Sequence, residues 1–433
     1  MSPLASFGLL GQKRYWPIWA GQVLGAFNDN LFRYALVTMA AYQGLAVLSM
    51  SPEEMAPIAA TAFTLPLFIF SAVAGQISDK FDRMKIMQIA KFCEIFLMAL
   101  AGVGFLLGQA WILLTVLFLM GIQTAFFVPA RSAAMPNVLE RHELVGGNAL
   151  LSGAINIMIL AGAIGGTMLV GEAWGPGALG GILIGCAVLG WLAMREGVPA
   201  PASNPAMKIS WNIAGQTWRI LVFGLKDRLV VGPLLGVAWF WLLAAAVITV
   251  LPVLTANVLG GAPSVVALFQ LMFTVGAALG AVLCAVLARG GEARWLSIVG
   301  AVGLVIFPLD LAVQALGRTP GPELIDAAAF LNAPENLRFL IGLTLAAVSG
   351  GLFLVPRQAM IQGRALPERR GRVLAASGVL NGASATLGQL VLLALAWLGA
   401  PLPSIFILIA AGSAVIVLTD VLRPGGPPPH QGE

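Results

Sequence analysis

The segment from Phe126 to Asn156 reads FFVPARSAAMPNVLERHELVGGNALLSGAIN, and a related segment from Leu352 to Asn381 reads LFLVPRQAMIQGRALPERRGRVLAASGVLN. Both contain Val-Pro, an Arg one or two residues later, a charged loop and then Ser-Gly-x-aliphatic-Asn. An internal repeat of this length is typical of transporters built from two related bundles. The repeat therefore predicts a chain made of two similar halves.

Long apolar runs surround both copies of the repeat. Hydrophobic residues make up 59% of the 433 residues and charged residues only 10%, a composition typical of membrane proteins. The runs approach the roughly 20 residues that a helix needs to cross the hydrocarbon core, and this favours helices over a lipid-facing barrel. We expect an all-α membrane protein whose twelve transmembrane helices form two pseudo-symmetric six-helix bundles, with spans at about 15–41, 55–77, 85–108, 111–133, 144–170, 176–194, 229–256, 264–288, 294–316, 338–360, 372–398 and 402–422.

The positive charges indicate how these spans are oriented. Of the 24 Lys and Arg, only Arg33 and Lys91 lie well inside spans, and only Arg318 and Arg338 lie on the side opposite the N-terminus. The other 20 lie in loops, in tails or within a few residues of span ends on the side of the N-terminus. By the positive-inside rule this distribution predicts an even number of helices and two cytoplasmic termini. The net charge of +5 is thereby explained as a topology signal, and binding to nucleic acid is not expected.

The chain divides between the sixth and seventh spans. A Pro-rich stretch, REGVPAPASNPAM, precedes apolar residues such as Trp218 and Leu225 that alternate with Lys and Arg. This pattern predicts a linker with an amphipathic helix on the membrane surface. We expect an N-terminal bundle at 1–195, a cytoplasmic linker at 196–228, a C-terminal bundle at 229–423 and a disordered tail at 424–433.

The first span carries an unusual polar stripe, within the stretch GAFNDNLFRY. Asp29 and Arg33 are one helical turn apart, and Gln22 lies two turns before Asp29 on the same side. Charged groups inside a membrane are costly, so these side chains must line a wet cavity or pair within the bundle. The stripe predicts a site for substrate or a coupling ion, and the alternative is a structural ion pair.

Two further spans contain ionisable residues. Lys91 and Glu94 are three residues apart on the third span and are expected to neutralise each other or to reach neighbouring helices. Asp310, in the ninth span, has no basic residue near it in the sequence. We expect Asp310 to be the second candidate, after Asp29, for coupling to an ion; the alternative is a solvated residue near a helix end.

The loop between the second and third spans reads GQISDKFDRMK. It resembles the signature loop of the major facilitator superfamily, with Asp82 in place of the usual glycine. The resemblance implies that Gly75, Asp79, Lys80 and Arg83 form a conformational latch, in which Asp79 faces a neighbouring helix end and basic partners. Ordinary positive-inside charge is the alternative.

Several segments together resemble the lysophospholipid transporter branch of this superfamily. They are GQVLGAFNDNLFRYAL, GIQTAFFVPARSAAMPNVL, GVAWFWLLAAAVITVLPVL and VPRQAMIQGRALPERRGRVLAAS. The resemblance implies inward movement of lysophospholipids, chiefly lysophosphatidylethanolamine, across a bacterial inner membrane for reacylation. It also implies a separate acyltransferase or acyl-ligase as a possible partner.

A zwitterionic lysolipid needs an acid or amide for its amine and a cation for its phosphate. Asp29, Asn28 and Asn30 are the candidates for the amine, and Arg33 and Arg131 are the candidates for the phosphate. Arg131 and Arg357 lie near span ends, where their side chains could instead extend to the membrane interface. The remaining candidates for lining the binding site are Gln22, Asn148 and Arg357.

Enzyme chemistry has little support in the sequence. His142 lacks the His-x-x-x-x-Asp pattern of an acyltransferase, and no P-loop is present. The three cysteines stand singly, so neither a disulfide framework nor a zinc site is expected. We expect no cofactor, with H⁺ or Na⁺ as a possible coupling ion. Two alternatives stay open: a proton-coupled exporter of drugs or metabolites, and a non-transporting partner of an acyltransferase.

Overall fold

The computed structural model describes residues 7–48, 50–140, 142–226, 229–288, 293–366 and 370–422. The predicted tail at 424–433 lies outside these residues, as do positions 227 and 228 at the end of the predicted linker.

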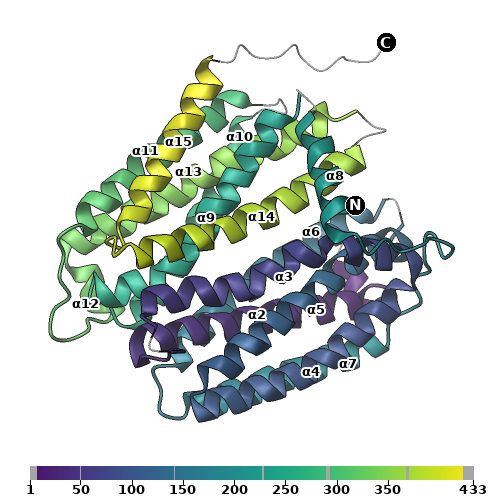
Figure 1. Ribbon diagram of the computed structural model, residues 1–433, viewed down its shortest axis with the longest axis horizontal. Coiled ribbons are helices and arrows are strands. Elements are labelled where there is room, and N and C mark those ends of the chain that lie inside the picture. The colour runs from purple at the N-terminus through teal and green to yellow at the C-terminus, as the bar shows by residue number, and fades with distance from the viewer. Residues whose placement is uncertain are drawn as a thin grey trace. The chain divides into compact units, whose positions relative to one another are not determined.

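Helices dominate these residues, and no strand is named among them (Figure 1). Three helices are short: η1 (Gly8–Gly11), α8 (Ile213–Lys226) and α12 (Ala327–Asn332). The other helices are long: α2 (Trp16–Gln43), α3 (Pro52–Lys80), α4 (Arg83–Leu107), α5 (Ala110–Val138), α6 (Leu144–Leu169), α7 (Gly175–Arg195), α9 (Val231–Asn257), α10 (Pro263–Leu287), α11 (Arg294–Ala315), α13 (Pro334–Arg364), α14 (Arg370–Trp397) and α15 (Ser404–Leu422).

The long helices correspond to the predicted spans. Within the described residues, eleven of them are long and apolar enough to cross a membrane. Helix α2 has 28 residues but falls short in hydropathy, because Asn28, Asp29, Asn30 and Arg33 interrupt its apolar sequence. The all-α membrane fold is confirmed, and the long helix that falls short, among those described, is the one that carries the polar stripe.

Helix ends follow local sequence signals. Ser51 and Glu54 form a reciprocal capping box at the start of α3. At the start of α4 the Asp82 carboxylate accepts a hydrogen bond from the backbone N–H of Lys85. Asp82 therefore replaces the expected glycine with a stabilising N-cap, and the loop between α3 and α4 keeps a tight turn.

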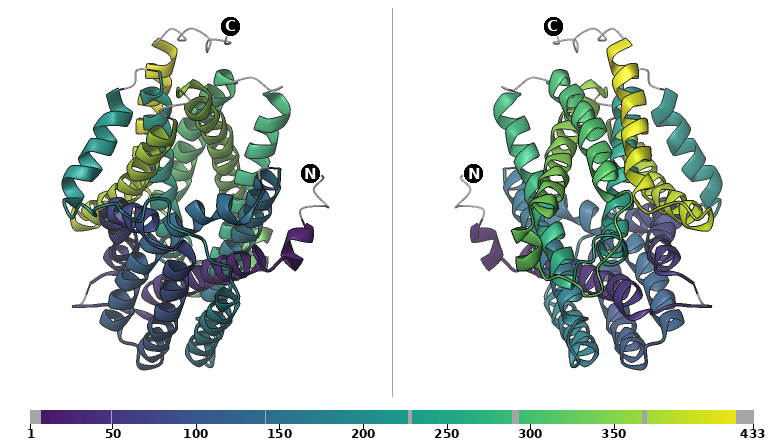
Figure 2. Two further views of the ribbon diagram at one scale, coloured as in Figure 1. Left: turned by 90° about the vertical axis from the view of Figure 1, so that its right-hand side faces the viewer. Right: turned by 90° about the vertical axis from the view of Figure 1, so that its left-hand side faces the viewer.

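The chain forms two compact units. One comprises Met1–Met55 and Ala59–Gln216, and the other comprises Ala56–Ile58 and Thr217–Glu433. Within the first unit α2 packs on α6 and α7, and α4 packs on α5 and α7. Within the second unit α9 packs on α14, and α11 packs on α13 and α15 (Figures 1 and 2). The pairs α2–α6, α4–α5 and α4–α7 thus have counterparts in α9–α14, α11–α13 and α11–α15, as the sequence repeat predicts.

Small residues hold α2 tightly against α6. A Cβ on Gly162 or on Gly166 would collide with the backbone carbonyls of Phe27 and Leu31, respectively. Gly-x-x-x-Gly spacing of this kind lets two helix backbones approach closely inside a membrane. The contact fixes the rotation of α2, and hence the directions in which its polar residues point.

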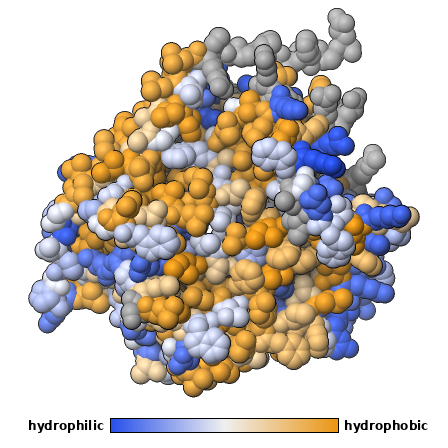
Figure 3. Space-filling model, in the orientation of Figure 1, coloured by the Kyte–Doolittle hydropathy of each residue, from blue (hydrophilic) through white to orange (hydrophobic). Residues whose placement is uncertain are grey.

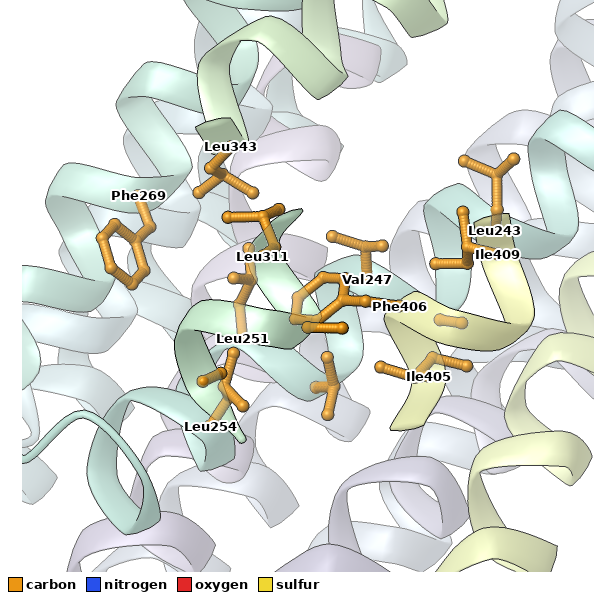
Figure 4. Close-up of a cluster of buried hydrophobic side chains, with 14 of the residues drawn as sticks. Leu243, Val247, Leu251, Leu254, Phe269, Leu311, Leu343, Ile405, Phe406 and Ile409 are labelled. Carbon is orange, nitrogen blue, oxygen red and sulfur yellow. The ribbon is translucent and has the colours of Figure 1, made fainter. Parts of the chain in front are cut away.

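The second unit has an extensive apolar core. Figure 4 shows side chains from α9, α10, α11, α13 and α15 meeting in one cluster. Its labelled members are Leu243, Val247, Leu251, Leu254, Phe269, Leu311, Leu343, Ile405, Phe406 and Ile409.

Apolar side chains also cover much of the outer surface of the helices. Figure 3 shows hydrophobic residues spread over the visible face, and Phe96, Leu106, Val286 and Val313 are among the exposed ones. A water-soluble protein rarely exposes so much contiguous apolar surface. This surface fits a multi-pass membrane protein whose helices face lipid.

An ion pair fastens the start of the chain to the loop between α5 and α6. The Arg14 guanidinium donates to the Glu143 carboxylate at 2.8 Å and to the backbone carbonyl of Val138 at 3.0 Å. The backbone N–H of Glu140 donates to the second Glu143 oxygen at 2.9 Å. Glu143 is buried, so this contact anchors the residues that lead into α2.

This contact predicts a pH dependence of stability. The hydrogen bond from Glu140, and then the Arg14 charge, hold the pKa of Glu143 below its ordinary value of 4.5. A depressed carboxyl pKa stabilises the fold above the ordinary value, and this stabilisation is lost as pH falls through the folded-state pKa. Melting temperatures in detergent should therefore fall between pH 6 and pH 3 by less in Glu143→Gln than in wild type. An equal fall in both would contradict the prediction, and the exposed Glu172→Gln is the matched control.

Candidate functional site

The polar residues of α2 point in different directions. Asn28 is fully buried and donates to the backbone carbonyl of Leu183 on α7 at 2.9 Å and to Glu94 on α4 at 3.4 Å. Asn30 is also buried and donates to the carbonyl of Ala26 one turn earlier at 2.8 Å. Asn28 thus bridges three helices, whereas the Asn30 amide is bound within α2.

A buried ion pair lies beside this helix. Lys91 and Glu94 are 2% and 3% exposed, and their ammonium and carboxylate groups are 2.6 Å apart. Gln123 of α5 donates to the same carboxylate oxygen at 3.3 Å. A Cβ added to Gly25 would collide with the Lys91 ammonium, so Lys91 lies directly over α2. The predicted neutralisation of Lys91 by Glu94 is confirmed.

Asp29 lies next to this pair without joining it. Its carboxylate interacts electrostatically with Glu94, Lys91 and Arg33. No hydrogen bond or ion pair binds it to any residue that the structure describes. The residue is half-buried, and its carboxylate oxygens keep their capacity to accept hydrogen bonds.

Arg33 does not form the ion pair with Asp29 that was considered as an alternative. Its guanidinium donates to Asn30 at 2.7 Å and lies 5.6 Å and 5.7 Å from the ring centroids of Tyr34 and Phe63. Cation–π contacts of this kind stabilise a cation without neutralising its charge. Asp29 and Arg33 are thus two separate charges on one helix.

Gln22 and Asn148 differ in their surroundings. The side-chain oxygen of Gln22 is buried and has no hydrogen-bond partner among the described residues. Asn148 is exposed, and its amide donates to the carbonyl of Leu144 in its own helix. Of these two residues, only Gln22 has a buried side-chain oxygen that accepts no hydrogen bond within the described residues.

The two repeat arginines occupy different positions. Arg357 is 4% exposed, ion-pairs with Asp420 and donates to the Ser297 hydroxyl at 2.9 Å. Arg131 is half-buried, and its Nε is buried without a hydrogen-bond partner among the described residues. When the two Val-Pro pairs are aligned, Arg357 matches Ala130, so Arg131 is shifted by one residue to another face of its helix.

Two of the four predicted latch residues, Asp79 and Arg83, fasten the loop between α3 and α4 to the linker. Asp79 lies 3.8 Å from the Arg83 guanidinium, and its carboxylate accepts from the Ser203 hydroxyl at 3.0 Å. Arg83, 5% exposed, also donates to the carbonyl of Pro201 at 3.0 Å. Gly75 has open space where a Cβ would lie, and the Lys80 ammonium lies 5.8 Å from the Phe81 ring centroid.

Asp310 has no basic residue near it in the sequence, but the fold supplies one. Its carboxylate ion-pairs with Arg338 at the start of α13, and Gln314 donates to its other oxygen at 2.6 Å. The two partners are 28 residues apart in the chain, so sequence proximity could not reveal the contact. Asp310 stays a predicted coupling residue, now with a competing structural role.

Sequence reasoning missed the part that Gln123 plays. Nothing in its own sequence surroundings marks it, because isolated Gln residues in membrane helices commonly bridge neighbours. The only signal in the sequence was that Gln123 lies in the span after the one that contains Glu94. The structure brings together Asn28, Asp29, Lys91, Glu94 and Gln123, and we call these five residues the α2–α4 polar cluster.

A group of three or more potential metal ligands is not found within the described ranges.

Comparisons with known proteins agree with this architecture. A family model described as transmembrane secretion effector matches residues 4–318. Lysophospholipid transporter LplT of Serratia proteamaculans (strain 568) is 26% identical over 377 residues, which cover 84% of this chain and 82% of that protein. LplT of Enterobacter sp. (strain 638) is 25% identical over 370 residues, covering 82% of this chain and 81% of that protein.

Solved structures share the fold at low sequence identity. A POT family transporter in complex with 5-aminolevulinic acid has a TM-score of 0.69 and 14% identity, covering 94% of this chain and 95% of that one. A bacterial homologue of the iron transporter ferroportin, in an inward-facing state, has a TM-score of 0.64 and 14% identity, covering 94% and 98%. At these identities the likeness shows the fold alone.

Proposed function

Because this chain belongs to the transmembrane secretion effector family of the major facilitator superfamily, we propose that it is a secondary transporter that carries lysophospholipids by alternating access. The names of its relatives support the substrate class. We further propose that it moves lysophosphatidylethanolamine from the outer to the inner leaflet of a bacterial inner membrane, with both termini in the cytoplasm. A separate acyltransferase or acyl-ligase would then reacylate the lipid.

The half-buried Asp29, whose carboxylate has no hydrogen-bond or ion-pair partner in the described part of the chain, is the observation that carries this proposal. An intramembrane acid without a hydrogen-bonded or ion-paired partner is expensive, and such groups usually bind a substrate or an ion. A lysophosphatidylethanolamine amine would supply the missing cation and satisfy the carboxylate. In the absence of lipid, H⁺ or Na⁺ would serve the same purpose, which makes Asp29 the first candidate for ion coupling.

The phosphate of the lipid needs a cation whose charge is not already neutralised. Arg33 forms no ion pair within the described residues: its guanidinium donates to an amide and lies near two aromatic rings. Arg131 has a buried Nε with unused hydrogen-bonding capacity. Arg357, by contrast, already ion-pairs with Asp420. We therefore assign the phosphate to Arg33 or Arg131 and expect Arg357 to stabilise the second unit.

Uptake of fluorescent lysophosphatidylethanolamine into proteoliposomes tests the proposal. We expect the wild-type protein to raise inward movement above that of protein-free vesicles and to discriminate between head groups, because charge-assisted contacts are geometrically specific. Runs with and without a proton or sodium gradient identify the coupling ion. Absence of head-group-dependent movement in every gradient would overturn the assignment.

A second candidate function is export of a small metabolite or drug driven by a proton gradient. The description of the matching family as a secretion effector favours this direction. The same vesicles discriminate between the two, because an exporter of this kind would leave lysolipid distribution unchanged and would acidify or alkalinise the lumen only when its own cargo is added.

A further inference from the structure

The first unit has an apolar groove that the proposed transport site does not use. It has a volume of about 820 Å³ and lies between α4 and α5, with the end of α3 closing one side. All of its lining residues belong to the first unit. We call it the α4–α5 groove.

The groove follows one face of each helix. On α4 the lining residues Ile86, Ile89, Cys93 and Leu97 recur every three or four positions, the spacing of a single helical face. From Ile86 to Leu97 a helix rises about 17 Å at about 1.5 Å per residue. The groove therefore has the length and the apolar lining that suit an extended acyl chain.

Two opposite charges stand at one end of the groove. Lys85 is exposed, and its ammonium has no hydrogen-bond or ion-pair partner within the described ranges. Asp82 receives the backbone N–H of Lys85 through one carboxylate oxygen, which leaves the second oxygen able to accept another hydrogen bond. A cation beside an anion complements a phosphate beside an amine.

The groove and the α2–α4 polar cluster share one residue, Gln123, which lines the groove. The Gln123 amide donates to Glu94 at 3.3 Å and to the carbonyl of Ala90 at 3.4 Å. A chain lying in the groove is thus one side chain away from the buried pair of Lys91 and Glu94. Gln123 provides a physical route by which occupancy of the groove could affect the cluster.

We propose that the α4–α5 groove binds one single-chain phospholipid, with its tail along α4 and α5 and its head group between Asp82 and Lys85. Bulk lipid could fill the apolar part equally well, so the specificity resides in the paired charges. The choice of a lysophospholipid with an amine head group rests on the proposed function. The groove itself is a second site, separate from the carboxylate of Asp29.

Photo-crosslinking in phosphatidylcholine nanodiscs tests this inference. Lysophosphatidylethanolamine with a diazirine in its tail should label residues within 86–97 and 119–126, as mapped by digestion and mass spectrometry. Unlabelled lysophosphatidylethanolamine should compete at least about tenfold better than monoacylglycerol, which lacks both head-group charges. Equal competition by the two would identify an ordinary annular lipid and would overturn the proposal.

Four variants sharpen the test. Lys85→Ala and Asp82→Asn should each reduce labelling several-fold, and Asn preserves the N-cap of α4. Cys93→Trp should obstruct the middle of the groove and strongly reduce labelling of α4 and α5. Leu100→Trp is the matched control, because Leu100 is exposed on the same helix but does not line the groove, and it should label as wild type does. Wild-type labelling in Cys93→Trp would contradict the proposal.

The result can be separated from that of the transport assay. The Asp29→Asn protein should lose uptake while its groove is labelled normally. Head-group-dependent labelling without any uptake by wild type would refute the proposed function and leave the groove site standing. Uptake without labelling of the groove would refute the groove site alone.

Discussion

Asp29→Asn is expected to lower lysophospholipid uptake by about 10- to 100-fold. This is the largest effect on transport that we expect from a single substitution. The exchange removes the charge and keeps the size, so the amine of the lipid loses a charge-assisted hydrogen bond worth about 1.5–3 kcal/mol, and each 1.4 kcal/mol corresponds to a factor of about ten. Initial rates in proteoliposomes, normalised to reconstituted protein, provide the measurement.

The matched control is Asp326→Asn. Asp326 caps the short helix α12 through a hydrogen bond from the backbone N–H of Ala329 at 2.7 Å, and Asn caps a helix about as well as Asp. This variant should transport as wild type does. Asp29→Glu, which keeps the charge on a longer side chain, should retain part of the activity. If Asp29→Asn transports at the wild-type rate, Asp29 has no role in substrate binding.

The second large effect is expected on stability. Lys91→Met should destabilise the protein by about 3–5 kcal/mol, because it leaves the buried Glu94 carboxylate without its cation. The hydrogen bonds from Asn28 and Gln123 compensate only in part. Replacing both members, as Lys91→Met with Glu94→Gln, should recover most of the loss, since exchanging a whole buried ion pair for neutral residues is often close to neutral.

Unfolding in mixed detergent micelles measures these differences as free energies, and the double-mutant cycle isolates the pair. Lys226→Met makes the same exchange at an exposed side chain at the end of α8 and should stay within about 0.5 kcal/mol of wild type. If the double variant is as unstable as Lys91→Met, the two residues stabilise the protein through separate contacts.

The sequence alone was sufficient for the architecture. Hydropathy located the long helices because a membrane requires apolar runs of nearly constant length, and the repeat revealed the duplicated packing because homologous segments bury equivalent faces. The local pairing of Lys91 with Glu94 was also predictable, since residues three apart on a helix are neighbours. Asp82 shows the limit of motif matching: the glycine pattern failed there, and capping chemistry explains why the turn persists.

Only the tertiary structure decided what each polar residue does. Asn28, Asp29 and Asn30 are adjacent in the sequence, yet one bridges helices, one has an unpaired carboxylate and one hydrogen-bonds within its own helix. The close contact between α6 and α2 sets these directions by fixing the rotation of α2. Asp310 forms an ion pair with Arg338, and Arg357 forms one with Asp420, in each case with a partner far away in the sequence. Hydropathy depends on composition along one helix, whereas the partner of a charge depends on which helices lie beside it, and that is a property of the packed bundle.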